Sequence, residues 1–231
     1  MDFYKHQMSV MKDLPGLREV TGNIPEEYHE AVNEKKKCRL YNRVFESDHY
    51  RKIRILYYDG GPNTQVFNSL LYPRYEHDLP VLGIDFLAFG KKKHLTVMDF
   101  QPLHDSHVVD FEPTLQSIKS NYPELGGKMS SKFYDETQFF SPELLFARFE
   151  DPSVVHEKLL PAFTEYLSYH IDMIKTNKPN PAIANQIYEK QREYDIYSAE
   201  RDPATGMFAG MFGKEWADTF VYDHLFELSR H

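Results

Sequence analysis

The chain has 231 residues, with 27 Lys and Arg against 35 Asp and Glu, and a formal net charge of −8. This length suits one globular α/β domain or two small ones, and the acidic balance argues against a general nucleic-acid-binding protein. No apolar run reaches the roughly 20 residues of a membrane span, and the single cysteine, Cys38, excludes an internal disulfide framework and fits a reducing, cytoplasmic compartment.

The first part of the chain changes from helical to strand periodicity at Cys38. Residues 4–14 have helical spacing that Pro15 ends, and residues 24–37 suggest a second short helix or arm. Short runs rich in β-branched and aromatic residues follow at 38–47, 50–58, 64–73, 79–89 and 93–102. Their short connections predict an antiparallel meander, and residues 142–150 are a further strand candidate.

Helical patterns return in the last third of the chain. Residues 151–153 supply cap residues for a long helix whose apolar stripe continues to about residue 175. Residues 182–200 read as a second helix, which Asp202-Pro203 interrupts, and residues 213–228 read as a last helix. Strands in the middle and helices at both ends predict an α+β domain in which helices cover one sheet.

Familiar catalytic and metal-binding motifs do not account for the chain. It has no G-x-G-x-x-G, P-loop or G-x-S-x-G sequence. Cys38 follows a basic run, but we interpret it as a half-buried strand cysteine rather than a reactive thiolate. His104-Asp105-Ser106-His107 could contribute zinc ligands, yet no Cys/His pair accompanies it, so we expect a solvated turn and no metal site.

Polar residues inside otherwise apolar strands are more informative. The alternation puts Asn68, Asp85 and Asp99 on the apolar faces of their strands. A buried carboxyl group that lacks a partner takes a raised pKa and can act as a proton donor near neutral pH. The alternative is a structural ion pair with a nearby arginine such as Arg54 or Arg148.

Two neighbouring features bear on these carboxyl groups. Gly83 lies two residues before Asp85, and glycine inside a strand allows a ligand to approach the backbone closely. Asp202 precedes Pro203, so a helix N-cap alone could explain its presence. Aromatic residues make up 15% of the chain, which indicates either an aromatic core or a pocket for a flat ligand.

Residues 68–90, NSLLYPRYEHDLPVLGIDFLAFG, closely resemble the signature of the ferredoxin-dependent bilin reductases. Further similarities follow in order at VMDFQP (97–102), FFSPELLFARF (139–149) and ERDPATGMF (200–208). The resemblance implies a single domain over residues 1–231. Its expected fold is a three-layer α/β/α sandwich with a central antiparallel sheet flanked by helices. It also implies a monomer that binds a linear tetrapyrrole between the sheet and the C-terminal helices, without metal or flavin.

The family resemblance implies roles for individual residues. Asp85 matches the catalytic aspartate on the sheet, and Asp202 matches the aspartate on the helical side. Asn68 stands where the phycocyanobilin-forming members carry a histidine, and Leu56 stands where we align their catalytic glutamate. Both differences favour the phycoerythrobilin branch of the family.

Substrate and partner contacts are implied in the same way. Arg148 matches an arginine that binds a propionate of the substrate, and Ser141 is a second candidate for that role. Reduced ferredoxin would deliver electrons one at a time, and ferredoxins are acidic. Its docking surface is therefore expected at Lys35–Lys37 or Lys91–Lys93, which could also be no more than solvated turns.

Within that branch, we expect the four-electron reduction of biliverdin IXα to phycoerythrobilin. The C15–C16 bridge and the A-ring diene would be reduced through bilin radicals, as in the phage-type synthases, with protons from Asp85 and Asp202. The alternative is a two-electron enzyme that makes 15,16-dihydrobiliverdin from biliverdin, or phycoerythrobilin from dihydrobiliverdin. A carrier that binds the bilin without reducing it is an alternative of a different class. The expected location is the cytoplasm of a cyanobacterial or phage-infected cell.

Overall fold

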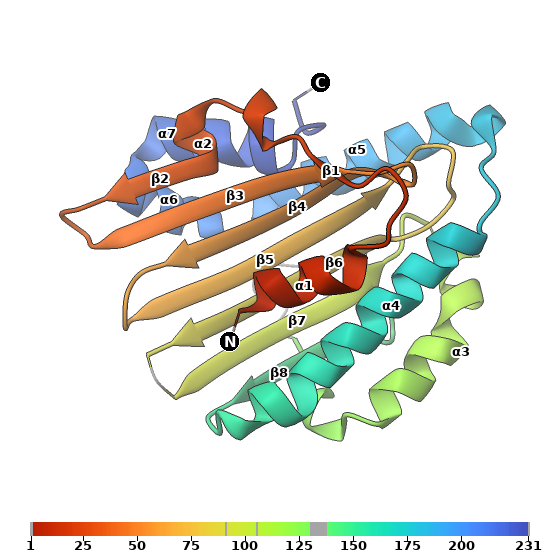
Figure 1. Cartoon of the computed structure of the whole chain (residues 1–231), viewed down its shortest axis with the longest axis horizontal. Coiled ribbons are helices and arrows are strands. Elements are labelled where there is room, and N and C mark those ends of the chain that lie inside the picture. The colour runs from red at the N-terminus through yellow and green to blue at the C-terminus, as the bar shows by residue number, and fades with distance from the viewer. Residues whose placement is uncertain (1, 91, 105, 130–137, 231) are drawn as a thin grey trace.

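An antiparallel sheet forms the centre of the computed structural model, which describes residues 2–90, 92–104, 106–129 and 138–230 (Figure 1). Its strands follow the order β1-β3-β4-β5-β6-β7-β8, and β2 pairs with β3. They are β1 (Arg18–Glu19), β2 (Glu30–Asn33), β3 (Cys38–Glu46), β4 (Tyr50–Asp59), β5 (Thr64–Pro73), β6 (Val81–Phe89), β7 (Lys93–Gln101) and β8 (Leu145–Phe149).

The successive strands β3 to β7 confirm the meander that the period-two pattern predicts, and β8 confirms the further strand candidate. Segment 24–37, predicted as a short helix or arm, forms one turn, α2 (Glu26–His29), followed by β2. Neither β1 nor β2 is long enough to give a periodic pattern, so the sequence does not predict them.

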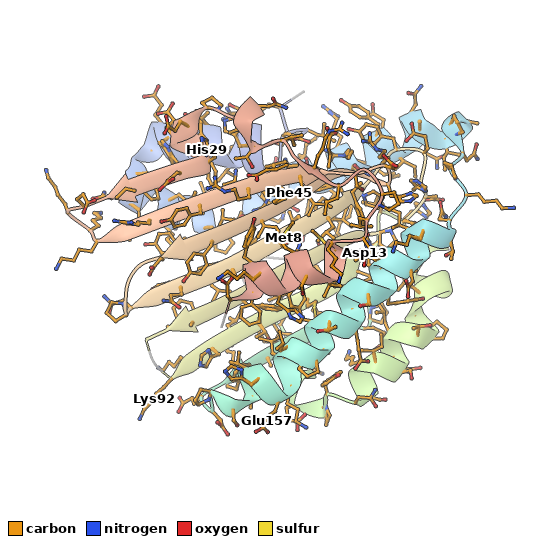
Figure 2. The ribbon with its side chains drawn as sticks, in the orientation of Figure 1. Met8, Asp13, His29, Phe45, Lys92 and Glu157 are labelled. Atoms are coloured by element: carbon orange, nitrogen blue, oxygen red, sulfur yellow. The ribbon has the colours of Figure 1, made fainter. Side chains whose placement is uncertain are left out.

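One face of the sheet is covered by α1 (Phe3–Met11), α3 (Ser106–Ser120) and α4 (Leu160–Thr176). Aromatic rings from both layers fill the space between them: the centroid of the Phe163 ring lies 6.0 Å from that of Phe67 and 5.4 Å from that of Phe86. Met8 of α1 packs against the same core, which includes Phe45 of β3 (Figure 2). Burial of these rings is the main source of stability on this face.

The long helix predicted after residue 153 is confirmed, but its first turn differs from an α-helix. Val155–Leu159 form a π-helical turn, η3, and α4 begins at Leu160 with Pro161 in its first turn. Leu160 donates its backbone N–H to the oxygen of Val155, so η3 runs directly into α4, and Pro161, which has no N–H to donate, stands where the π-helical turn changes to the α-helix. The sequence does not predict α3, which contains Pro113.

The opposite face is covered by α5 (Ala184–Arg201), α6 (Ala204–Phe212), α7 (Lys214–Thr219) and the π-helical turn η5 (Phe220–Leu225). Asp202-Pro203 separates α5 from α6, as predicted. The predicted last helix is instead divided into α7 and η5, and α6 is not predicted. Helices on both faces of one antiparallel sheet confirm the predicted α+β, three-layer α/β/α sandwich.

The remaining helical turns are of the 3-10 type: η1 (Thr21–Asn23), η2 (Pro123–Leu125) and η4 (Pro181–Ile183). Within the described ranges, no helix is both long and apolar enough to cross a lipid bilayer.

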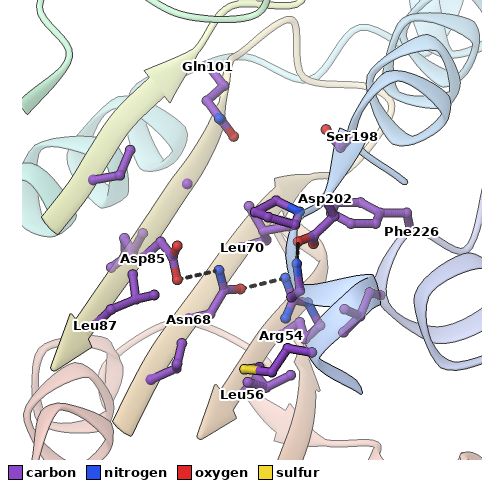
Figure 3. Close-up of a pocket in the computed structure, with 18 of the residues that line it drawn as sticks. Arg54, Leu56, Asn68, Leu70, Asp85, Leu87, Gln101, Ser198, Asp202 and Phe226 are labelled. Atoms are coloured by element: carbon purple, nitrogen blue, oxygen red, sulfur yellow. Dashed lines mark hydrogen bonds between the residues drawn. The ribbon is translucent and has the colours of Figure 1, made fainter. Parts of the chain in front are cut away.

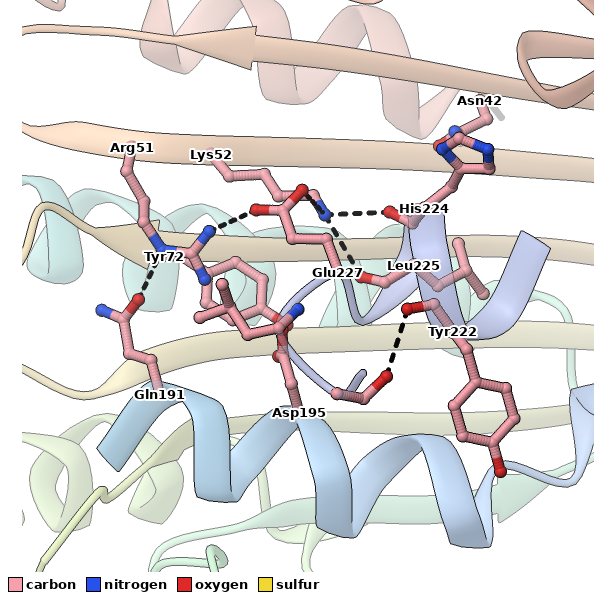
Figure 4. A network of polar contacts seen from close by, with 12 residues as sticks. Asn42, Arg51, Lys52, Tyr72, Gln191, Asp195, Tyr222, His224, Leu225 and Glu227 are labelled. Atoms are coloured by element: carbon pink, nitrogen blue, oxygen red, sulfur yellow. Dashed lines mark hydrogen bonds and ion pairs between the residues drawn. The ribbon is translucent and has the colours of Figure 1, made fainter. Parts of the chain in front are cut away.

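A partly buried network of charges ties the C-terminal segment to β4 (Figure 4). Lys52 Nζ donates to Glu227 Oε2 over 2.7 Å and to the backbone oxygen of His224 over 2.9 Å. Arg51 donates to the same carboxylate and to Gln191 of α5. Burial favours a raised pKa for Glu227, but Lys52 and Arg51 outweigh it and lower this pKa to about 2. The network therefore fixes the chain end against the sheet beside the C-terminal helices.

Candidate active site

A cavity of about 320 Å³ lies between the sheet and the C-terminal helical layer. Its floor comes from β4 to β7, and its roof comes from α5, α6 and residues 225–226. Most of the side chains around it are apolar or aromatic, among them Leu70, Leu87, Met207, Phe208 and Phe226. A cavity of this size and lining suits a largely apolar organic ligand.

The floor carries a row of side chains from neighbouring strands. Strand register pairs Leu56 with Asn68, Asn68 with Asp85, and Asp85 with Val97. Paired residues of an antiparallel sheet project to the same face, so all four line the cavity. The period-two pattern predicts that Asn68 and Asp85 lie on the apolar faces of their strands, and the register adds that the four residues are direct neighbours.

A hydrogen-bonded chain runs along this row (Figure 3). Asn68 donates from Nδ2 to Oδ1 of Asp85 over 3.1 Å, and Asn68 Oδ1 accepts from Nη2 of Arg54 over 2.7 Å. Burial raises the pKa of Asp85 to about 7, against the lowering effect of Asn68, and the charges of Asp202 and Arg54 act in opposite directions. The ion-pair alternative is therefore wrong in its direct form, because Arg54 reaches Asp85 through the amide of Asn68.

Asp202 approaches the same cavity from the helical layer. It follows the last residue of α5, and its Oδ1 accepts from the backbone N–H of Ala204 over 2.8 Å. Burial raises its pKa, while the Ala204 hydrogen bond and the charge of Arg54 act to lower it. Asp202 thus caps α6 and also lines the cavity.

Gly83 makes room for a side chain of the protein itself. A Cβ at Gly83 would lie 2.5 Å from Oε1 of Gln101, which is too close for any real contact. That same oxygen accepts a hydrogen bond from the hydroxyl of Tyr194 on α5. Gln101 and Tyr194 both line the cavity, and sequence reasoning misses both because they come from opposite layers.

The two residues expected to bind propionates lie elsewhere. Ser141 is buried and donates its hydroxyl to Oδ1 of Asp99, whose Oδ2 accepts from the Ser141 backbone N–H over 2.8 Å. Arg148 is exposed on β8, where its guanidinium lies 5.3 Å from the centre of the Phe146 ring. Neither lines the cavity. A role in substrate binding stays a prediction for both, and the alternative of Arg148 as a buried partner of Asp85 or Asp99 is wrong.

The remaining candidates have structural surroundings. Cys38 lies in β3, which confirms a strand cysteine, but at 2% exposed it is fully buried rather than half-buried. His104 contacts Asp78 over 2.7 Å, and Ser106 begins α3 rather than continuing a turn, while Asp105 lies outside the described residues. In the described part of the chain, no three His, Cys, Asp or Glu residues gather as metal ligands.

Comparison with known proteins identifies the fold and the family. The sequence profile described as ferredoxin-dependent bilin reductase matches residues 7–227. Proteins named 15,16-dihydrobiliverdin:ferredoxin oxidoreductase are similar to this chain. The one from Nostoc punctiforme is 42% identical over 187 residues, covering 79% of this chain and 76% of that protein. The one from Gloeobacter violaceus is 36% identical over 229 residues, covering 97% and 93%.

A solved structure has the same fold at lower sequence identity. Phytochromobilin synthase from tomato in complex with biliverdin aligns with a TM-score of 0.84 at 22% identity, over 99% of this chain and 83% of that one. The profile match and the relatives confirm the resemblance first visible in residues 68–90. The chain belongs to the ferredoxin-dependent bilin reductase family.

Proposed function

We propose that this protein reduces biliverdin IXα to 15,16-dihydrobiliverdin with electrons from ferredoxin. The proposal rests on the name shared by the relatives from Nostoc punctiforme and Gloeobacter violaceus, 15,16-dihydrobiliverdin:ferredoxin oxidoreductase, and the second of these aligns over almost the whole chain. This favours the two-electron alternative over the four-electron synthesis of phycoerythrobilin that the motifs led us to expect.

The cavity has the chemistry that this reaction needs. Two reduced ferredoxins each give one electron, and the bilin takes up two electrons and two protons across its C15–C16 bridge. The apolar walls exclude water from the reacting carbons, so each proton has to come from the protein. Asp85, whose pKa is about 7, retains a proton near neutral pH and faces the cavity, so it gives the first of the two protons in this proposal. Asp85 is only partly buried, so it takes up a further proton from solvent and gives that one as the second.

A specific observation keeps the four-electron reaction as a second candidate. Asp202 lines the cavity from the layer opposite Asp85, and burial raises its pKa too. The four-electron reaction takes up two protons at the bridge and two at the A-ring. Two acids on opposite sides of a flat tetrapyrrole can each serve one of these two places. A carrier that only binds the bilin has no use for either acid.

Ferredoxin is proposed to dock where basic turns meet the end of the cavity at which Phe89 is exposed. The register pairs Arg39 with Asp59 and Thr64 with Phe89, so the turns before β3 and before β7 lie at one end of the sheet. Thr64 and Phe89 line the cavity there. Lys35 and Lys37 are exposed in the first turn, and Lys92 is exposed in the second (Figure 2). Lys91 lies outside the described residues.

Two measurements test these proposals. In an anaerobic reaction with biliverdin and enzymatically reduced ferredoxin, chromatography should find 15,16-dihydrobiliverdin as the end product. If the product is converted onward to phycoerythrobilin, the four-electron reaction replaces the two-electron proposal. Bound but unreduced biliverdin would favour the carrier.

The docking proposal is tested by the charge reversal Lys35→Glu/Lys37→Glu, which should raise the KM for ferredoxin and reduce the dependence of this KM on salt. An unchanged KM at low salt would exclude this turn.

A further inference from the structure

Arg54 is a buried cation in the floor of the cavity. Its side chain is 1% exposed, and no other Lys or Arg is found among the described residues that line the cavity. Its Nη2 donates to Asn68, while Nε and Nη1 are buried without a hydrogen-bond partner in the described structure. Burial removes water from this guanidinium, and one hydrogen bond offsets only part of the free-energy cost to the fold. A buried Arg54 therefore calls for a reason beyond stability.

The contact with Arg54 decides which way the amide of Asn68 faces. A guanidinium only donates hydrogen bonds, so Asn68 must turn its oxygen toward Arg54 and its NH₂ group toward Asp85. The NH₂ group likewise only donates, so the Asp85 oxygen that it contacts, Oδ1, has to accept. The C=O oxygen of a protonated carboxyl group is a much better acceptor than the O–H oxygen, so a proton on Asp85 is held by the other oxygen, Oδ2.

The charged and titratable groups around Arg54 come from every layer of the site. Tyr72 lies on β5, Tyr194 on α5, Asp202 in the turn after α5, and Asp85 on β6, and the charge of Arg54 is coupled to all four. The same charge lowers the pKa of both Asp85 and Asp202 against the effect of their burial. One cation thus acts on both acids of the cavity.

We propose that Arg54 is a positioning residue: it holds the oxygen of Asn68, directs the amide N–H at Oδ1 of Asp85, and so keeps the donated proton on Oδ2. This inference deepens the proposed function and rests on it for the role of that proton. The arrangement itself belongs to the ligand-free protein. It can therefore be measured whether or not biliverdin is reduced.

The test measures the protonation of Asp85 directly. The infrared band of its protonated carboxyl group, assigned by subtracting the Asp85→Asn spectrum, is followed against pH in the ligand-free protein. In Arg54→Met, the band should persist to higher pH than in the wild type, because the Asn68 amide loses its fixed orientation and the nearby positive charge is gone. Arg54→Lys keeps a donor and a charge and should restore the wild-type titration.

Coupling through Asn68 is tested by a double-mutant cycle. Asn68→Leu removes the amide, so Arg54→Met should move the Asp85 titration by less than half as much in that background. An equal shift in both backgrounds would overturn positioning through Asn68. Arg43→Met is the matched control, because Arg43 lies on the neighbouring strand, bonds to His29, and is outside the cavity. It should leave the titration unchanged.

Kinetics separate this proposal from substrate binding and from the proposed function. Arg54→Met should lower kcat with biliverdin about tenfold or more, with little change in the dissociation constant of biliverdin. A loss of affinity at unchanged kcat would make Arg54 a substrate-binding residue and overturn the positioning role. If the wild type binds but does not reduce biliverdin, the proposed function fails, while the infrared titration still decides on Arg54.

We expect Arg54→Met to fold, because a buried site that holds a charged side chain often tolerates an apolar side chain of similar length. If Arg54→Met does not fold, the Asp85 titration is measured instead in Arg54→Lys and Asn68→Leu.

Discussion

Asp85 and Asp202 face one cavity from opposite layers of the sandwich (Figure 3). Asp85 comes from the middle of β6, and Asp202 comes from the turn between α5 and α6. Burial raises the pKa of both, and the negative charge of Asp202 further raises that of Asp85. The two acids therefore act on each other as well as on anything bound between them.

Asp202→Asn should separate the two possible reactions. The variant keeps an oxygen to accept from Ala204 but loses the negative charge that raises the pKa of Asp85. A two-electron enzyme should still form 15,16-dihydrobiliverdin, with the high-pH fall in kcat/KM moved to lower pH. A four-electron enzyme should instead stop at this intermediate.

The chain offers a closely matched control for that variant. Asp151 also precedes a proline and accepts a backbone N–H two residues later, from Ser153 over 2.9 Å, but it is exposed and does not line the cavity. Asp151→Asn should leave both the products and the pH profile unchanged. If it shifted the profile as much as Asp202→Asn, the effect would belong to capping and not to charge in the cavity.

The wild-type enzyme should lose activity as the pH rises through about 7. The folded-state pKa of Asp85 is raised, so its proton is present below about pH 7 and is lost above it. Because kcat/KM reports the free enzyme, it should fall about tenfold for each pH unit well above that value. As a control, the rate at which ferredoxin itself is reduced is measured separately at each pH. A kcat/KM profile that stays flat from pH 6 to 9 would argue against Asp85 as the donor.

Gly83→Ala should disturb the contact between Gln101 in the floor of the cavity and Tyr194 in its roof. The new methyl group would displace the Gln101 side chain and break its contact with Tyr194. Loss of one buried hydrogen bond should lower the free energy of unfolding by about 1 kcal/mol and weaken biliverdin binding. Calorimetry and a biliverdin titration measure the two effects. Gly22→Ala is the control, since a Cβ there meets nothing within 4 Å and Gly22 does not line the cavity.

Glu227→Gln should destabilise the C-terminal segment by leaving Lys52 and Arg51 without their carboxylate. We expect a loss of about 2 kcal/mol in the free energy of unfolding, less than for a fully buried pair because Glu227 keeps contact with water. The wild-type pKa is lowered to about 2, so this stabilisation is present above the usual value of 4.5 and is lost as the pH falls toward 2. Denaturant unfolding at pH 7 and pH 3 should therefore show a smaller difference at pH 3, and equal differences would contradict the sign.

The sequence predicts the sheet well because strand alternation is local. The same alternation places Asn68 and Asp85 on one face, but their hydrogen bond depends on the register of β5 against β6. Gln101 and Tyr194 are 93 residues apart, so no local pattern could reveal their contact. The π-helical turn η5 likewise depends on packing against the sheet, which overrides the simple helix that the pattern predicts.

The most direct test of the account is an anaerobic reaction of Asp85→Asn with biliverdin and reduced ferredoxin, followed by electron paramagnetic resonance and product chromatography. The amide is similar in shape to the carboxyl group but cannot donate an acidic proton. We predict wild-type affinity for biliverdin, transfer of the first electron, and a bilin radical that persists without dihydrobiliverdin. Dihydrobiliverdin formed at the wild-type rate would contradict the central claim that Asp85 donates the proton.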